Sequence, residues 1–198
     1  GTNTYAGGAT WTVPASDSNF TLTALWNTQT LTYSYDTNGG GTAPDGGTKT
    51  YGQTLVLAAS TSLSKTGYTF AGWNDGSTTS NAGASVSITT NKIFVAQWSA
   101  QSFSITYDGN GSSSGSVTAG SYVAGGVPYA IAANGFTRAG YNFAGWHTTA
   151  GGTGGTDYVA GAGYSTAVNL VLYAKWTPAS YTITYNGNGS TGGNVPSA

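Results

Sequence analysis

The sequence predicts a mainly β chain in which a small module is repeated in tandem. Three observations carry this prediction: a motif occurs twice, apolar and polar residues alternate with a period of two, and good helix formers are scarce. The motif Gly-Tyr-Thr-Phe-Ala-Gly-Trp at residues 67–73 returns as Gly-Tyr-Asn-Phe-Ala-Gly-Trp at residues 140–146, which is 73 positions later. A repeat of this kind indicates the architecture more strongly than any single residue does.

An opening segment occurs three times, at residues 31–36, 103–108 and 181–186. In each segment apolar or aromatic residues alternate with polar ones, which predicts a strand with one buried face. An Asn-Gly pair follows each segment, at residues 38–39, 110–111 and 188–189. Asn-Gly accepts positive φ at both positions, so we expect a tight hairpin turn after each strand.

A closing segment that ends on tryptophan also occurs three times, at residues 20–26, 94–98 and 170–176. Val95 and Tyr173 add apolar residues to the second face, which predicts a central strand that is buried on both sides. A further strand is expected over residues 50–57 and roughly 121–127. The stretches 57–63 and 128–134 are each long enough for one short helix at most, and such short helices are marginal without packing.

These repeats divide the chain into two whole modules that are flanked by two partial ones. We expect the whole modules at residues 29–101 and 102–178. Residues 1–28 match the C-terminal part of a preceding repeat, and residues 179–198 match the N-terminal part of a following one. A module of about 75 residues has a core that is only marginally sufficient for stability.

Charged residues are few in this chain of 198 residues. It has five Lys plus Arg, six Asp, no Glu and a net charge of −1. Nucleic acids and anionic membranes require clustered Lys and Arg, so these partners are not expected. The chain has no Cys, which excludes disulfides and thiolate metal sites. No apolar run approaches the ~20 residues that span a bilayer, so membrane insertion is not expected.

The motifs together resemble the internalin-type B repeat, also called the Listeria–Bacteroides repeat. The residues that carry the resemblance are Tyr35-Asp36-Thr37-Asn38-Gly39-Gly40, the motif at 67–73, and Leu172-Tyr173-Ala174-Lys175-Trp176. The resemblance covers nearly the whole chain. It implies small α+β, β-grasp-like modules on secreted or surface-anchored bacterial proteins, where they form stalks or adhesive segments. The family has no agreed catalytic residues, so the resemblance assigns none here.

Two roles are open to the aromatic residues, which are abundant at 13% of the chain. Aromatics that recur with the repeat on apolar strand faces are expected in the core. The expected core residues are Trp26, Tyr35, Phe70, Trp73, Trp98, Tyr107, Phe143, Trp146 and Trp176. Aromatics without a repeated counterpart are candidates for ligand contact, by stacking on a sugar. These candidates are Trp11, Tyr122, Tyr129 and Tyr158.

Other motifs favour structural roles over chemistry. Asp108-Gly109-Asn110-Gly111 resembles the start of a calcium loop, but it lacks later acidic ligands, so we interpret it as a turn. His147, the only histidine, lies in a Gly/Thr-rich loop and is interpreted as a solvated residue. Lys92 and Lys175 are candidates for isopeptide cross-links to asparagine, but the absence of Glu disfavours this chemistry. We therefore expect no catalytic residue, no metal site and no cofactor.

The sequence thus favours a structural or adhesive repeat segment of an extracellular, cell-surface bacterial protein, which acts as a stalk and not as an enzyme. Its expected partners are neighbouring copies of the repeat or chain, or a host or cell-surface glycan or protein. The out-of-phase ends suggest head-to-tail filaments formed by strand pairing, because exposed strand edges recruit other strands. The alternative is a carbohydrate- or ligand-binding module that uses exposed aromatics.

Overall fold

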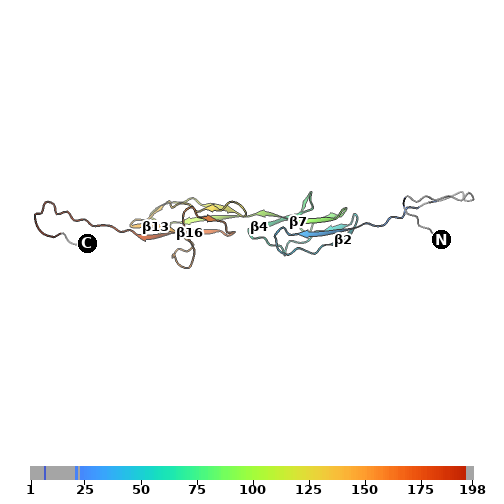
Figure 1. Cartoon of the computed structure of the whole chain (residues 1–198), viewed down its shortest axis with the longest axis horizontal. Coiled ribbons are helices and arrows are strands. Elements are labelled where there is room, and N and C mark those ends of the chain that lie inside the picture. The colour runs from blue at the N-terminus through green and yellow to red at the C-terminus, as the bar shows by residue number, and fades with distance from the viewer. Residues whose placement is uncertain (1–6, 8–20, 22, 195–198) are drawn as a thin grey trace, which may run out of the picture.

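The computed structural model describes residues 7, 21 and 23–194 of the chain. Figure 1 shows two bodies of strands that follow one another along the long axis of the molecule. We call residues 30–100 module 1 and residues 102–178 module 2. The described residues contain strands and turns but no helix, so the α part of the expected α+β class is wrong for them.

Each module has one five-stranded mixed sheet, and the two sheets have equivalent strand orders. In module 1 the order is β2-β1-β7-β4-β5, in which the central pair β1–β7 is parallel and the other pairs are antiparallel. A two-stranded ladder, β3–β6, completes the module. The strands are β1 (Thr30–Asp36), β2 (Gly47–Thr50), β3 (Thr54–Val56), β4 (Tyr68–Asn74), β5 (Thr79–Ser80), β6 (Ser85–Ser87) and β7 (Lys92–Ala100).

Module 2 repeats this plan with the order β10-β8-β16-β13-β14, and its central pair β8–β16 is again parallel. The ladder β11–β15 corresponds to β3–β6, and module 2 has an additional small ladder, β9–β12. The strands are β8 (Ser102–Asp108), β9 (Ser114–Gly115), β10 (Gly120–Val123), β11 (Tyr129–Ala130), β12 (Phe136–Thr137), β13 (Tyr141–His147), β14 (Asp157–Tyr158), β15 (Gly163–Tyr164) and β16 (Leu170–Pro178). The closing strands β7 and β16 are central, as their two apolar faces predicted.

Each module has its own hydrophobic core between the sheet and the ladder. In module 1 the buried members are Leu31, Tyr35, Leu55, Leu57, Trp73, Ile88, Phe94 and Ala96. In module 2 they are Ile105, Tyr122, Ile131, Trp146, Tyr164, Leu172 and Ala174. Trp73 and Trp146 are completely buried, and the partly buried rings of Phe70, Trp98, Tyr107, Phe143 and Trp176 pack against these clusters.

One peptide segment in each core is held from both sides by aromatic side chains. In module 1 the N–H of Ala58 donates to the Tyr35 hydroxyl at 3.0 Å, and the Ala58 carbonyl accepts from Trp73 Nε1 at 2.9 Å. The two rings are 4.7 Å apart between centroids. We call this arrangement the Tyr-Ala-Trp clamp. It satisfies backbone groups that burial would otherwise leave unpaired, at a cost of about 1–3 kcal/mol each.

Module 2 has the same clamp at equivalent positions. The N–H of Ala132 donates to the Tyr107 hydroxyl at 2.7 Å, and its carbonyl accepts from Trp146 Nε1 at 3.0 Å. The ring centroids of Tyr107 and Trp146 are 4.8 Å apart. Tyrosine and tryptophan each have an apolar ring and a polar group, so they fill the core and also fix the loop that crosses it.

The tryptophan that closes each module fastens the turn after the opening strand. Trp98 Nε1 donates to the Thr37 carbonyl at 2.9 Å, and Trp176 Nε1 donates to the Gly109 carbonyl at 2.9 Å. Asn38 and Asn110 in these turns have φ of 49° and 46°, as expected for Asn-Gly. The connection is longer than a two-residue hairpin, however, because β1 ends at residue 36 and β2 begins only at residue 47.

The repeated motif forms a β-bulge at its glycine. The β4–β7 register shifts between Phe70 and Gly72, and the β13–β16 register shifts between Phe143 and Gly145. Gly72 has a φ of 138°, and a Cβ there would lie 2.8 Å from the Ser80 carbonyl oxygen. A neighbouring strand therefore approaches Gly72 closely, and this approach requires glycine.

The structure differs from the sequence predictions at the second strand of each module and at Trp26. The strand expected over 50–57 is broken, because Gly52 has a φ of 77° and turns the chain between β2 and β3. Gly125 ends the expected strand at 121–127 in the same way. Trp26, which was expected in the core, is 90% exposed and lies outside any strand. No opening strand or turn that could accept its indole N–H precedes it among the described residues.

The Tyr-Ala-Trp clamp predicts a specific cost for removing one hydroxyl. Tyr107→Phe leaves the partly buried Ala132 N–H without an acceptor, so we expect module 2 to lose about 1 kcal/mol of unfolding free energy. Urea unfolding measures this loss. Tyr51→Phe, at an exposed position, is the matched control and should have no effect. An equal change in both variants would contradict the role of the clamp.

The same residue predicts a dependence on alkaline pH. Burial raises the pKa of Tyr107 from its ordinary value near 10 to about 12. Its contribution to stability is therefore complete below pH 10 and is lost as the pH rises from 10 through about 12, because the unfolded state ionises first. The stability difference between the wild type and Tyr107→Phe should shrink over this range.

Candidate functional surfaces

Of the four aromatic candidates for ligand contact, the three that the structure describes pack against the core of module 2 and form no exposed common site. Tyr122 is only 6% exposed and belongs to the core of module 2, which corrects its assignment as an exposed contact residue. Its side chain points inward from β10, where strand alternation places it on the buried face. Tyr129 and Tyr158 are half-buried and pack against the same core. Trp11 lies outside the described residues.

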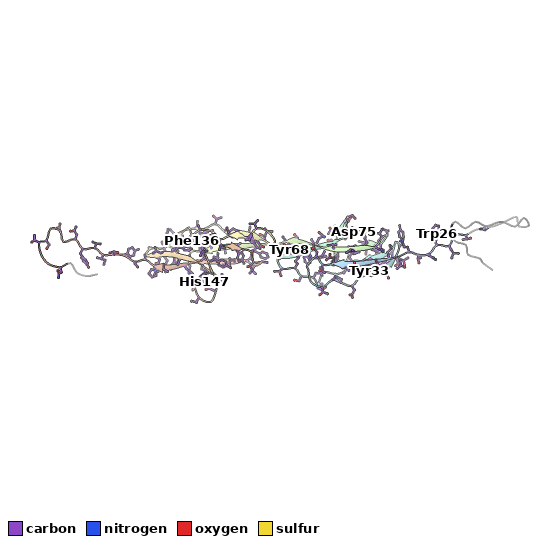
Figure 2. The ribbon with its side chains drawn as sticks, viewed as in Figure 1. Trp26, Tyr33, Tyr68, Asp75, Phe136 and His147 are labelled. Atoms are coloured by element: carbon purple, nitrogen blue, oxygen red, sulfur yellow. The ribbon has the colours of Figure 1, made fainter. Side chains whose placement is uncertain are left out.

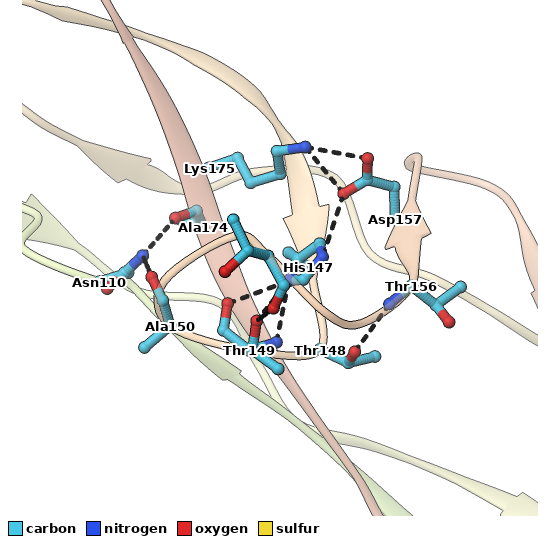
Figure 3. Close-up of polar contacts among 10 residues, drawn as sticks. Asn110, His147, Thr148, Thr149, Ala150, Thr156, Asp157, Ala174 and Lys175 are labelled. Atoms are coloured by element: carbon cyan, nitrogen blue, oxygen red, sulfur yellow. Dashed lines mark hydrogen bonds and ion pairs between the residues drawn. The ribbon is translucent and has the colours of Figure 1, made fainter.

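The histidine expected to be solvated is instead a buried anchor. His147 ends β13 and is only 4% exposed. Its Nδ1 accepts a hydrogen bond from the Thr149 backbone N–H at 3.0 Å, as Figure 3 shows. In module 1 the equivalent Asn74 Oδ1 accepts from the Gly76 N–H at 2.9 Å. Histidine thus replaces asparagine as the acceptor two residues before the bonded amide.

The loop that follows His147 is held by several polar contacts. Thr149 Oγ1 donates to the Thr153 carbonyl at 2.8 Å, and the Thr156 N–H donates to Thr148 Oγ1 at 2.9 Å. Asn110 Nδ2 donates to the carbonyls of Ala150 and Ala174, both at 2.9 Å, and so joins the loop to β16. The longer loop of the second repeat projects from module 2 beside His147 (Figure 2), and these hydrogen bonds hold its base (Figure 3).

Each module has one lysine–aspartate pair beside its sheet, at different positions. In module 1 Lys92 Nζ lies 2.7 Å from Asp75 Oδ2, and this hydrogen bond holds the pKa of Asp75 well below its usual range. In module 2 Lys175 Nζ donates to both oxygens of Asp157, at 2.8 and 2.9 Å, and lowers the pKa of that exposed carboxyl. Both lysines considered for isopeptide chemistry are therefore paired with carboxylates.

The turn at residues 108–111 is organised by its own side chains. Asp108 Oδ1 accepts the Asn110 N–H at 2.7 Å, and the Asn110 carbonyl faces Arg138 Nη1 at 3.5 Å. This Asx-type bond explains the Asp-Gly-Asn-Gly sequence without a metal ion. Within the described residues, no three His, Cys, Asp or Glu side chains gather as a metal site would require.

A shallow hollow of about 320 Å³ lies on module 2, between this turn and the ordered loop. Its lining residues are Asn110, Arg138, Ala150, Gly151, Gly152, Lys175 and Trp176. Two of the five cationic side chains of the chain therefore line a single hollow. Sequence reasoning missed Arg138. The available signal was its position two residues before the repeated motif, where module 1 has Lys65.

The residues after β16 repeat the opening pattern but form no strand in the described part of the chain. Tyr181, Ile183 and Tyr185 are exposed, whereas their counterparts Ile105 and Tyr107 pack in the core of module 2. Residues 185–194 alone line an open hollow of about 390 Å³.

No helix long and apolar enough to cross a membrane occurs among the described residues.

Comparison with known proteins finds the same repeat. The sequence profile of the Listeria-Bacteroides repeat domain matches the chain twice, over residues 31–97 and 103–175. A protein described as a putative Gly-rich membrane protein, from Evansella cellulosilytica, is 29% identical over 177 residues, which cover 82% of this chain and 20% of that protein. Internalin H from Listeria monocytogenes is 31% identical over 158 residues, which cover 72% of this chain and 27% of that protein. The chain thus spans about a fifth and about a quarter of these relatives.

The anchoring role of His147 predicts opposite behaviour of two variants. His147→Leu removes the acceptor for the Thr149 N–H, so we expect rapid hydrogen exchange at that amide and a loss of about 1–3 kcal/mol. His147→Asn keeps an acceptor, as Asn74 does in module 1, and should preserve much of the amide protection. Amide hydrogen exchange followed by NMR measures both. Protection of Thr149 in the leucine variant would show that the loop does not depend on His147.

Proposed function

Because the chain belongs to the Listeria-Bacteroides repeat domain family, we propose that it is a structural repeat segment of a bacterial cell-surface protein and acts as a stalk or adhesive fibre. The observation that carries this proposal is that each module has its own core and the two modules lie in line (Figure 1). Length then grows with the number of modules. The repeated residues serve packing and backbone hydrogen bonding, so the proposal includes no enzymatic role.

We further propose that each module, with bounds close to residues 29–101 and 102–178, is a β-grasp-like unit. The central parallel pair of first and last strands, flanked by antiparallel strands, supports this assignment. In this proposal the ladders β3–β6 and β11–β15 take the place of a helix across the sheet, because they supply buried residues such as Leu55 and Tyr164.

Assembly by the ends is a separate part of the proposal. The exposed alternating residues Tyr181, Ile183 and Tyr185 match the register of an opening strand. An opening strand is stable only beside a closing strand, as β1 is beside β7. Pairing of residues 181–186 with residues 20–26 of another molecule would supply that neighbour and would give head-to-tail filaments.

Small-angle X-ray scattering tests the stalk and the assembly together. A single compact globule of 150 residues has a radius of gyration of ~15 Å. For residues 29–178 we expect a clearly larger value because the modules lie in line, and a value near ~15 Å would contradict the stalk. The forward intensity of the full chain should rise with concentration more than that of residues 29–178. Equal association of both would rule out pairing by the ends.

A second candidate function is ligand binding, which the hollow of module 2 favours. Arg138 supplies a positive charge and Trp176 an aromatic ring, as a carboxylate-bearing saccharide requires, whereas Lys175 beside them is paired with Asp157. NMR titration with a uronic-acid disaccharide should shift the Trp176 indole signal, and Arg138→Gln should abolish the shift. Lys65→Gln, at the matched position of module 1, is the control. A titration without chemical-shift changes would contradict saccharide binding at this hollow.

A further inference from the structure

The two modules are joined by a single residue that is hydrogen-bonded to both. β7 ends at Ala100 and β8 begins at Ser102, so only Gln101 lies between them. Its N–H donates to the Gly67 carbonyl of module 1 at 2.8 Å, and its carbonyl accepts from the Ala124 N–H of module 2 at 3.0 Å. Gln101 is therefore a fixed part of the junction and not a flexible linker.

The surfaces that meet at this junction fit closely and depend on small residues. A Cβ at Gly67 would lie 2.7 Å from the Ala124 Cβ and 3.1 Å from the Ala167 Cβ. The Tyr68 hydroxyl of module 1 lies against Gly125 and leaves no room for a side chain there. Figure 2 shows Tyr68 between the two modules. The Gly67-Tyr68 turn of one module is thus seated on the Ala124-Gly125 turn of the next.

Module 2 has an equivalent turn at its far end, and no residue that the structure describes covers it. The Ala179 N–H donates to the Gly140 carbonyl at 2.9 Å, as the Gln101 N–H does to the Gly67 carbonyl at 2.8 Å. In the described part of the chain, however, no atom lies within 4 Å of a Cβ built at Gly140, and Tyr141 is 39% exposed. Arg138 lies over the Tyr141 ring at 4.1 Å from its centroid. The Gly140-Tyr141 turn thus has the conformation of the Gly67-Tyr68 turn without a module packed against it.

We propose that the Gly140-Tyr141 turn is a docking surface for a further copy of this repeat, which seats a small-residue–glycine turn equivalent to Ala124-Gly125 on it. The argument is continuity with the junction already formed between modules 1 and 2. The residues after Ala179 support this docking. Tyr181 is at the position equivalent to Phe103 of module 2, and it is 78% exposed and so available for contact. The inference rests on the proposed role as a repeat segment.

The two modules of this chain differ in their ability to be this partner. Module 1 has Tyr51-Gly52 at the position of Ala124-Gly125, and the Tyr51 N–H donates to the Gln29 carbonyl as Ala124 does to Gln101. Tyr51 is 58% exposed, and no atom of residues 23–194 lies within 4 Å of a Cβ built at Gly52. Because a Cβ built on Gly67 would lie only 2.7 Å from the Ala124 Cβ, a tyrosine in place of Ala124 would bring its ring against the Gly67 turn. A repeat of the module 2 type therefore docks, and one of the module 1 type does not.

Two extended chains test this inference. Both keep residues 1–180 and continue with a second copy of residues 103–178 in one chain, or of residues 31–100 in the other. ¹⁵N relaxation reports whether the added module tumbles with module 2, and hydrogen exchange reports protection of Ala179. We expect joint tumbling only with the copy of 103–178. Tyr51→Ala, made in the added copy of 31–100, should restore joint tumbling.

Two results would overturn the inference: independent tumbling of the added copy of 103–178, or equal docking of both copies. The spectra of the added modules show directly that they are folded, so a folding failure is not mistaken for lack of docking. The proposed stalk role fails separately, through a compact scattering profile. A flexible string of folded modules would contradict the docking surface and leave that role intact.

Discussion

The structure depends on one polar constraint in each core, the peptide unit held between a tyrosine hydroxyl and a tryptophan N–H. The segment containing Ala58 or Ala132 crosses the face of the sheet with Leu57 or Ile131 buried beside it. A buried segment of irregular backbone is stable only if its N–H and C=O groups are paired. The Tyr35 and Tyr107 hydroxyls and the Trp73 and Trp146 N–H groups supply these partners, and no buried side-chain polar atom of the described residues is itself left unpaired. The aromatic rings therefore determine both the packing and the path of the chain.

Local pattern was enough to predict the principal strands but not what covers them. Alternation at residues 31–36 and 103–108, and apolar residues on both faces of 94–98 and 170–176, correspond to the four central strands. The ladders β3–β6 and β11–β15 were not predicted, because they form between short segments about 30 residues apart. Trp26 shows that local pattern can also predict a strand that does not form. Its segment has the sequence of a closing strand, but a strand needs a neighbouring strand to pair with.

The candidate surfaces were harder to predict than the fold, because exposure depends on which face a short strand presents. Tyr122 has no aromatic counterpart in the first repeat, yet β10 directs it into the core. His147 lies at the start of a Gly/Thr-rich loop, yet that loop folds over it and uses its ring as an acceptor. The hollow near Arg138 joins residues from four separate segments, so no continuous motif could have indicated it.

The parallel pairing of the first and last strands has a mechanical consequence. β1 and β7 lie side by side in the same direction, as do β8 and β16, so the chain enters each module at one end and leaves at the other. Tension along the chain then pulls the two strands past one another, and all hydrogen bonds between them bear the load simultaneously. An antiparallel terminal pair would instead open one bond at a time. The topology thus suits a segment that transmits force between the points it connects.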